Sequence, residues 1–226
     1  MARTDFNLLS KALTRTVAGL VLICLMLFLP AGTFDYSGGW MFIALLFVPM
    51  TIAGVVLFVK SPYLLRKRLD AKEGEKAQKT VVALSGLMFI AVFVLAGLDF
   101  RFGWTSVPGW LFRTSSAVFL LAYLMYAEVI RENAWLSRTI DVQEDQKVVS
   151  TGLYGIVRHP MYSATILLFL SIPLILGSWI SFGVMLLYIP IIAARIRNEE
   201  SVLETSLEGY TEYKKKVRFK VIPGLW

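Results

Sequence analysis

Residues 163–194 read SATILLFLSIPLILGSWISFGVMLLYIPIIAA, an apolar stretch that is interrupted by Gly177 and Ser178. The arm before this interruption has about fourteen residues, fewer than the roughly 20 apolar residues that cross a bilayer. The two arms predict a helical hairpin that enters and leaves the membrane from one side. Pro173 lies inside the first arm and Pro190 interrupts the second, which membrane helices tolerate when neighbouring groups satisfy the freed carbonyl.

Four further apolar runs precede the hairpin and predict membrane spans over residues 13–31, 40–59, 80–98 and 110–130. Hydrophobic residues make up 57% and charged residues 17% of the 226 residues, whereas about a quarter of a soluble domain is charged. We therefore expect an all-α, polytopic membrane protein with about six membrane segments in a single domain. Residues 198–217 predict a C-terminal amphipathic helix, because apolar side chains recur there at helical spacing.

The net charge of +7 is distributed beside the apolar runs, which is typical of a membrane surface and argues against nucleic-acid binding. The N-terminus, residues 60–79, the region after the fourth span and the C-terminal tail are all rich in Lys and Arg. The intervening connections contain very few cations. By the positive-inside rule we expect both termini, and the polar segment before the hairpin, to face the cytoplasm.

That polar segment, residues 152–163 (GLYGIVRHPMYS), contains the single histidine of the chain. Pro160 predicts the first turn of a new helix, and the residue before a proline is held extended. His159 and Arg158 would then lie where the free N–H groups of the helix create a positive end, a natural anchor for a carboxylate. The alternative is that both side chains merely flank a membrane helix as interfacial anchors.

A second polar cluster follows the other arm of the hairpin, with Arg195, Arg197, Glu199 and Glu200. Arg195 and Glu199 are four residues apart, so they share a helix face and can pair. Because the hairpin returns to the side from which it starts, we expect this cluster to meet His159 and to enclose a nucleoside-sized cavity. The alternative is a solvated network of ion pairs at a helix end.

Other polar residues are weaker candidates. Asn133 and Gln146 precede the histidine segment and are within reach of a ligand bound there. Glu128 lies near the end of the fourth span, where Arg131 can neutralise it. Asp99, Arg101 and Trp104 are best explained as part of an aromatic belt at the opposite membrane surface.

The chain contains a pattern of Tyr154, Arg158, His159, Pro160 and Tyr162, followed by Arg197, Glu199 and Glu200 and then by Gly209 and Tyr213. This pattern resembles the isoprenylcysteine carboxyl methyltransferase family. Its broader relatives are membrane phospholipid methyltransferases. The similarity is strongest over residues 148–223. It implies a cytosolic pocket for S-adenosylmethionine, formed by residues 141–226, and a lipid-borne acceptor that enters sideways from the bilayer past residues 1–140.

The resemblance implies roles for individual residues at these positions. His159, Tyr162 and Glu199 or Glu200 would contact the cofactor, and Arg195 or Arg197 would help to hold the acceptor. With the aromatic and charged neighbours included, the candidate cofactor-binding residues are Tyr154, Arg158, His159, Pro160, Tyr162, Glu199 and Glu200. The candidate catalytic residues are Arg195, Arg197 and Glu200.

The reaction implied is methyl transfer from a sulfonium, an in-line displacement that requires no metal. The sequence has one cysteine and one histidine, so it offers no clustered metal ligands. A carboxylate acceptor is already ionised near neutral pH and needs an arginine to orient it. An amine acceptor would instead need a group that takes its proton.

Three alternatives remain open at this point. The chain could be a phospholipid or amine N-methyltransferase, an NADPH-dependent sterol-type membrane reductase, or a membrane scaffold or transporter without enzymatic activity. The adjacent Glu199 and Glu200 argue against a phosphate-rich cofactor such as NADPH, because like charges repel.

Overall fold

A computed structural model describes residues 3–70, 76–133, 135–136 and 142–226, and every regular element in these ranges is a helix. Residues 71–75, which belong to the predicted basic segment 60–79, lie outside the described residues. The same holds for residues 137–141, where the predicted boundary between entrance and cofactor-binding region falls.

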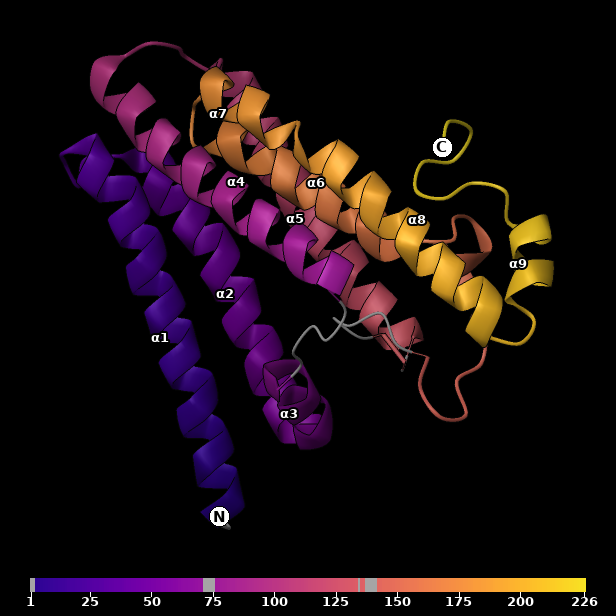
Figure 1. Ribbon diagram of the computed structural model, residues 1–226. Coiled ribbons are helices and arrows are strands. Elements are labelled where there is room, and N and C mark those ends of the chain that lie inside the picture. Colours follow the sequence, from indigo (N-terminus) through magenta and orange to yellow (C-terminus); the bar gives the residue numbers. More distant parts are fainter. Residues whose placement is uncertain (1–2, 71–75, 134, 137–141) are drawn as a thin grey trace.

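Four long helices form the first part of the chain, and they contain the four predicted spans: α1 (Arg3–Ala31), α2 (Ser37–Lys60), α4 (Lys76–Phe102) and α5 (Gly109–Glu132). Each extends beyond its apolar run, because helices continue through the interface where flanking polar residues reach water. A short helix, α3 (Pro62–Asp70), lies beside the N-terminal end of α1 in Figure 1. It covers part of the predicted basic segment.

The predicted hairpin is formed by α6 (Pro160–Ile175), α7 (Trp179–Met185) and α8 (Tyr188–Ser206). Gly177 has a left-handed φ of +82° at the turn, which favours glycine. The second arm breaks at residues 186–187, one turn before Pro190. The break has a local cause, because a proline ring clashes with the carbonyl four residues earlier and removes one helical hydrogen bond.

Five helical stretches in the described part of the chain are long and apolar enough to cross a membrane. They are Asn7–Ala31, Ser37–Lys60, Ala83–Phe102, Gly109–Glu132 and Trp179–Ser206. The shorter apolar helix Pro160–Ile175 adds a sixth segment. The prediction of an all-α, polytopic membrane protein with about six membrane segments is confirmed.

The predicted amphipathic helix over residues 198–217 is wrong in its bounds. Helix α8 continues without a break from the membrane to Ser206, and a separate short helix, α9 (Tyr210–Lys216), follows. Gly209, with φ +81°, makes the bend between them. The apolar stripe nevertheless holds together, because residues on both sides of the bend pack into one small cluster: Leu203, Leu207, Tyr210, Tyr213 and Val217, together with Val142 and Val148.

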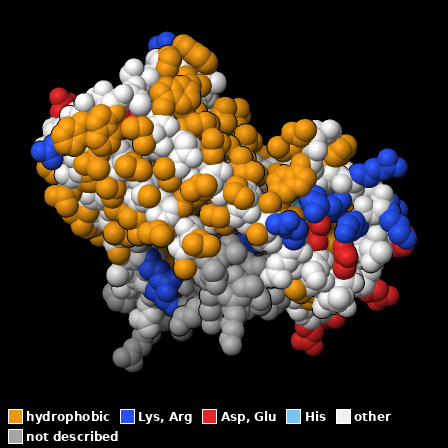
Figure 2. Space-filling view, turned by 45° about the horizontal axis from the view of Figure 1, so that its top comes forward, with side chains coloured by type: hydrophobic (Ala, Val, Ile, Leu, Met, Phe, Trp, Pro, Cys, Tyr) orange, Lys and Arg blue, Asp and Glu red, His pale blue; other side chains and the backbone are white. Residues whose placement is uncertain are grey.

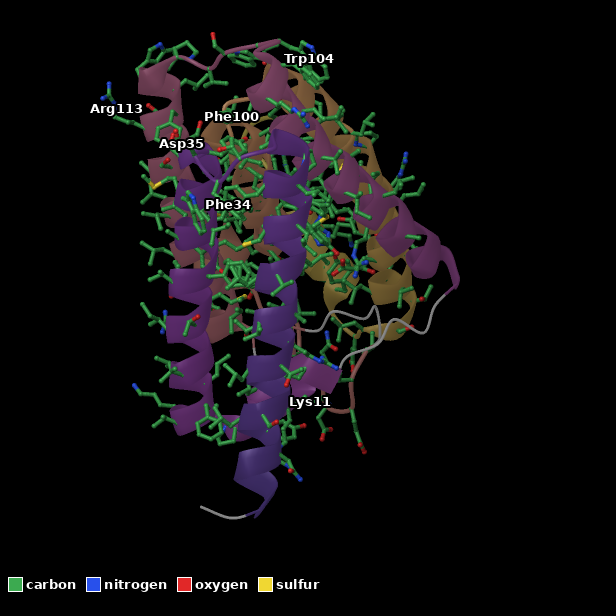
Figure 3. The ribbon with its side chains drawn as sticks, turned by 90° about the vertical axis from the view of Figure 1, so that its left-hand side faces the viewer. Lys11, Phe34, Asp35, Phe100, Trp104 and Arg113 are labelled. Atoms are coloured by element: carbon green, nitrogen blue, oxygen red, sulfur yellow. The ribbon has the colours of Figure 1, made fainter. Side chains whose placement is uncertain are left out.

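The connections that are poor in cations meet at one end of the helices, which we name the turn end. The Tyr36 hydroxyl donates to the Leu176 carbonyl at 2.5 Å, so the α1–α2 loop contacts the hairpin turn. Ser178 donates to the Asp99 carboxylate at 2.5 Å. In Figure 3, Phe34, Phe100 and Trp104 lie at this end, whereas Lys11 lies at the other.

Asp99 is part of this turn end and is only 1% exposed. Its carboxylate also accepts hydrogen bonds from the Thr105 backbone N–H at 2.7 Å and from the Thr105 hydroxyl at 2.5 Å. Trp104, in contrast, is exposed, as expected for an interfacial belt. Asp99 therefore organises the loop after α4 and attaches it to the hairpin, which the aromatic-belt interpretation of this residue did not include.

Helices α4 to α8 form the packed part of the molecule, and α1 and α2 flank it on one side (Figure 1). Helix α1 approaches α4 closely at Gly97, where an added Cβ would lie 2.5 Å from the Leu27 carbonyl oxygen. Such small-residue contacts are typical of helix packing in lipid. Figure 2 shows apolar side chains over much of this bundle, and Lys and Arg side chains gathered at the side that carries α8, α9 and the C-terminal tail.

Candidate active site

The two ends of the hairpin meet, as the sequence predicts. His159 is the N-cap of α6 with φ −125° and ψ 62°, and Pro160 is the first helical residue. The His159 Nε2 atom lies 3.3 Å from Glu200 Oε1, and its Nδ1 atom lies 3.9 Å from Glu199 Oε1. The end of α8 and the start of α6 therefore share one site.

Glu200 holds this junction together. It is 4% exposed, and its Oε1 atom accepts a hydrogen bond from Arg158 Nε at 2.7 Å. Its other oxygen lies 3.1 Å from Lys220 Nζ. A buried carboxylate is stable when cations and hydrogen bonds replace its lost hydration, and Glu200 has both.

The C-terminal tail, residues 217–226, completes the surroundings of Arg158. The guanidinium Nη1 atom donates to the carbonyls of Val217 and Arg218, both at 2.8 Å. The backbone N–H groups of Arg158 and His159 donate to the carbonyls of Phe219 and Lys220 at 2.9 and 2.8 Å. The tail thus runs alongside the segment before α6 and fixes it by main-chain hydrogen bonds.

Tyr162 connects the two arms of the hairpin. Its hydroxyl donates to Glu199 Oε2 at 2.5 Å and accepts a hydrogen bond from Arg195 Nε at 3.0 Å. Arg195 and Glu199 do share a helix face, and Tyr162 joins them across the gap between α8 and α6. We name these three residues the Tyr162 group. The ring of His159 lies beside it, with 5.7 Å between the His159 and Tyr162 ring centres.

Tyr154 forms another wall of the site, on the short 3-10 helix Gly152–Gly155. Its hydroxyl accepts a hydrogen bond from Asn133 Nδ2 at 2.9 Å, and its carbonyl accepts one from the Tyr213 hydroxyl at 2.7 Å. Burial raises the pKa of Tyr154 to about 12, more than the Asn133 hydrogen bond lowers it. The phenol is therefore neutral at physiological pH.

The turn that carries Tyr154 depends on Gly152, which has a left-handed φ of +49°. A Cβ at this position would lie 1.4 Å from a carboxylate oxygen of Glu132. That carboxylate in turn accepts the Leu153 backbone N–H at 3.0 Å. The end of α5 thereby fixes the start of the histidine segment.

These walls surround a cavity that opens to solvent, with about 860 Å³ of empty space when the solvent at its mouth is included. Six of the predicted site residues line it: Tyr154, Arg158, His159, Tyr162, Arg195 and Glu199. The weaker candidates Asn133 and Gln146 also line it.

Three predicted residues have other positions. Glu200 and Pro160 are buried and support the cavity wall without being part of its lining. Arg197 is exposed and also lies outside the lining. Glu128 pairs with Arg131, whose Nε atom lies 2.8 Å from its carboxylate, so the predicted neutralisation is present.

Sequence reasoning missed the apolar and aromatic part of the cavity lining, which we name the apolar wall. Its residues are Trp135, Leu136, Val148, Val149, Met161, Val202, Leu203, Leu207 and Tyr210. Several of them belong to the amphipathic helix predicted over residues 198–217, and apolar side chains at helical spacing indicate packing without distinguishing the residues that line a cavity. Among the described residues, no group of three or more His, Cys, Asp or Glu side chains could hold a metal ion.

Comparison of the sequence with known protein families indicates which class of reaction this site could catalyse. Residues 114–208 match the phospholipid methyltransferase family. The match supports a methyltransferase class for this segment, which is less than half of the chain. It includes the whole hairpin, the histidine segment and the Tyr162 group, whereas α9 and the tail lie beyond it. It does not support the narrower assignment to the isoprenylcysteine carboxyl methyltransferase family. A search of curated proteins gave no match.

Proposed function

We propose that this protein is an S-adenosylmethionine-dependent methyltransferase that acts on a lipid-associated acceptor at the cytoplasmic membrane face. The observation that carries the proposal is the Tyr162 group. In this group, one tyrosine hydroxyl is hydrogen-bonded to both the cation of Arg195 and the carboxylate of Glu199. The group lies in a cavity at the end of a membrane hairpin. The carboxylate of Glu199 suits a cationic methyl donor, and the cation of Arg195 suits an anionic acceptor.

The lining residues fit this cofactor. A sulfonium and an ammonium are attracted by carboxylates and by aromatic faces, the latter contributing about 0.5–2 kcal/mol. Glu199, Tyr154 and Tyr162 provide such groups, and the apolar wall suits a flat nucleoside base. When bound, S-adenosylmethionine would supply an electrophilic methyl group. The protein has to hold and orient it and exclude water.

Arg195 orients the acceptor in this proposal. It lines the cavity and is held by its Nε hydrogen bond to Tyr162. A guanidinium pairs strongly with a carboxylate, and a carboxylate nucleophile needs no general base. Correct positioning of two reactants can account for about 7–11 kcal/mol of a barrier. The isoprenylcysteine resemblance favours a carboxylate acceptor of this kind.

An amine acceptor is the second candidate, and the phospholipid methyltransferase match favours it. An ethanolamine-type headgroup must lose a proton before or during transfer. Glu199 and His159 both line the cavity and lie 3.9 Å apart, so they are the two groups placed to take this proton. The two candidates share one site and differ in whether Arg195 or Glu199 contacts the acceptor.

The test is transfer of a radiolabelled methyl group from S-adenosylmethionine into extracted membrane lipids and proteolipids. Wild type is compared with Glu199→Gln and Arg195→Ala, and Lys215→Ala serves as the control because it lies on the exposed side of α9, paired with Glu212. We expect both cavity variants to lose at least tenfold in rate and the control to keep the wild-type rate. Equal labelling by all four proteins would contradict the proposal.

The labelled product also identifies the acceptor. A methyl ester releases its label as methanol in mild base, whereas an N-methyl amine keeps it. Calorimetric titration with S-adenosylhomocysteine and with NADPH tests the remaining enzymatic alternative. Binding of NADPH alone would favour the reductase and would overturn the methyltransferase proposal.

A further inference from the structure

Tyr210 is the one side chain in the described part of the chain whose buried polar atom has no hydrogen-bond partner. It is the first residue of α9, is 4% exposed, and lines the cavity. An unsatisfied buried hydroxyl costs about 1–3 kcal/mol, and native proteins contain few of them. Such a group needs an explanation, and a site that is filled during function provides one.

The neighbouring tyrosines differ from Tyr210 in this respect. The Tyr213 hydroxyl donates to the Tyr154 carbonyl, and the Tyr154 hydroxyl accepts from Asn133. The rings of Tyr210 and Tyr213 lie 5.8 Å apart in the same small cluster. Three tyrosines therefore line one side of the cavity, and the hydroxyls of two are already used within the protein.

The surroundings of Tyr210 keep its hydroxyl protonated. Burial, together with the carboxylates of Glu200 and Glu199, raises the pKa of Tyr210 well above its ordinary value. A neutral phenol can donate a hydrogen bond. The Tyr210 hydroxyl is therefore a protonated donor, shielded from bulk water, that has no acceptor within the described part of the protein.

The chemistry around Tyr210 indicates which part of a ligand it contacts. Leu203, Leu207 and Val148 surround it in the small cluster and also line the cavity. An apolar wall beside a hydroxyl donor without a protein partner fits the face and edge of a nitrogen heterocycle, whose ring nitrogens accept hydrogen bonds, and the nearby carboxylates of Glu199 and Glu200 suit the donor groups of the same nucleoside. The charged side chains of the Tyr162 group also suit the amino-acid end of the cofactor.

We propose that the Tyr210 hydroxyl donates a hydrogen bond to the nucleoside part of the bound cofactor and so recognises it. This inference rests on the proposed function, because it assigns one residue to one end of S-adenosylmethionine. Tyr210 is a binding residue in this role, and it takes no part in the transfer of the methyl group.

The experiment compares Tyr210→Phe with Tyr213→Phe in the full-length protein in detergent. Two ligands are titrated by calorimetry: S-adenosylhomocysteine, and 5′-methylthioadenosine, which lacks the amino-acid end. Thermal unfolding of the ligand-free proteins is measured in parallel. Tyr213→Phe is the matched control, because it removes the same atom from a hydroxyl that already has a protein partner.

For Tyr210→Phe we expect unchanged or higher thermal stability, because the hydroxyl removed has no partner in the protein. We expect weaker binding of both ligands, by about 5- to 30-fold, because the ligand loses one hydrogen bond in a buried site. For Tyr213→Phe we expect lower thermal stability, because a buried carbonyl loses its donor.

Each other outcome overturns the inference. Unchanged affinity of Tyr210→Phe for both ligands would mean that the hydroxyl contacts neither. Weaker binding of S-adenosylhomocysteine alone would place the contact at the amino-acid end. Lower thermal stability with unchanged affinity would indicate a structural role. If the wild-type protein binds neither ligand, the proposed function itself fails, a result distinct from a loss confined to the variant.

Discussion

Both ends of the hairpin bury a carboxylate, and they satisfy it in different ways. At the turn end, Asp99 accepts hydrogen bonds from Ser178 and from Thr105. At the cavity end, Glu200 is paired with Arg158 and Lys220 and contacts His159. The donors to Asp99 are neutral, whereas those to Glu200 carry positive charge or can acquire it.

The difference indicates a division of roles. The hydroxyl and N–H groups around Asp99 belong to the loop after α4 and to the hairpin turn, so they close that end and hold it. The cations around Glu200 hold the segment before α6 and the tail, while a cavity stays open beside them. One end keeps helices together, and the other leaves a cavity open beside its charged groups.

The largest effect that we predict is from Glu200→Gln. The substitution leaves the Arg158 guanidinium buried without its counter-charge, which typically costs about 3–5 kcal/mol. We expect a corresponding loss in the free energy of unfolding, measured by denaturant titration in detergent, and loss of S-adenosylhomocysteine binding. Glu212→Gln, which breaks an exposed pair with Lys215, should leave both unchanged. Equal stability of the two variants would show that Glu200 does not anchor the site.

Asp99→Ala should have the next largest effect. It removes the acceptor for the Ser178 and Thr105 hydroxyls, and a buried polar group left unsatisfied costs about 1–3 kcal/mol. We expect lower stability in the same titration, but an affinity for S-adenosylhomocysteine within twofold of wild type. A fall in affinity as large as that of Glu200→Gln would mean that the two ends are coupled, against the division of roles.

Two glycines allow a direct comparison of the ends. Gly152 and Gly103 both have left-handed φ values, +49° and +64°, and alanine in this conformation costs about 1–2 kcal/mol. A Cβ at Gly103 meets nothing within 4 Å, whereas one at Gly152 collides with Glu132. Both Gly→Ala variants should lose stability, but calorimetry should show weaker ligand binding only for Gly152→Ala. Equal affinities would mean that the turn before Tyr154 does not shape the cavity.

The smallest change in stability is expected from Arg197→Ala, because Arg197 is exposed and surface substitutions are usually within about 0.5 kcal/mol. Arg195→Ala, which removes a hydrogen bond to the buried Tyr162, is compared with it. Their rates should differ. Arg195 lines the cavity and contacts Tyr162, so its removal should lower kcat/KM at least tenfold. The loss for Arg197→Ala should be smaller. A larger loss for Arg197→Ala in the methyl-transfer assay would reverse the assignment.

Local sequence signals predicted much of this structure. The apolar runs gave the helices, because the bilayer sets their length. Pro160 predicted where α6 begins, because proline is suited to the first helical position. The return of the hairpin to its starting side predicted the contact between His159 and the glutamates, which the structure confirms. Each of these inferences depends on residues that are close in the sequence or related by simple topology.

Contacts between distant segments could not be predicted in this way. The bonds from Arg158 to the carbonyls of Val217 and Arg218 join residues about sixty positions apart, and a main-chain carbonyl has no signature in the sequence. The bend at Gly209 was missed because the apolar spacing continues across it while φ becomes positive. Tyr210 belongs to this predicted amphipathic helix, and helical spacing does not distinguish a residue that lines a cavity, as Tyr210 does, from one that packs against another helix.

The length of α6 has a consequence for where the chemistry takes place. Its 16 residues rise about 24 Å, which is about 6 Å less than the hydrocarbon thickness of a bilayer. If the hairpin turn lies at one boundary of the hydrocarbon, an untilted α6 places His159 about 6 Å inside the opposite boundary. In the proposed function, a lipid-borne substrate at that depth is modified while its tails remain in the bilayer, without being lifted into water.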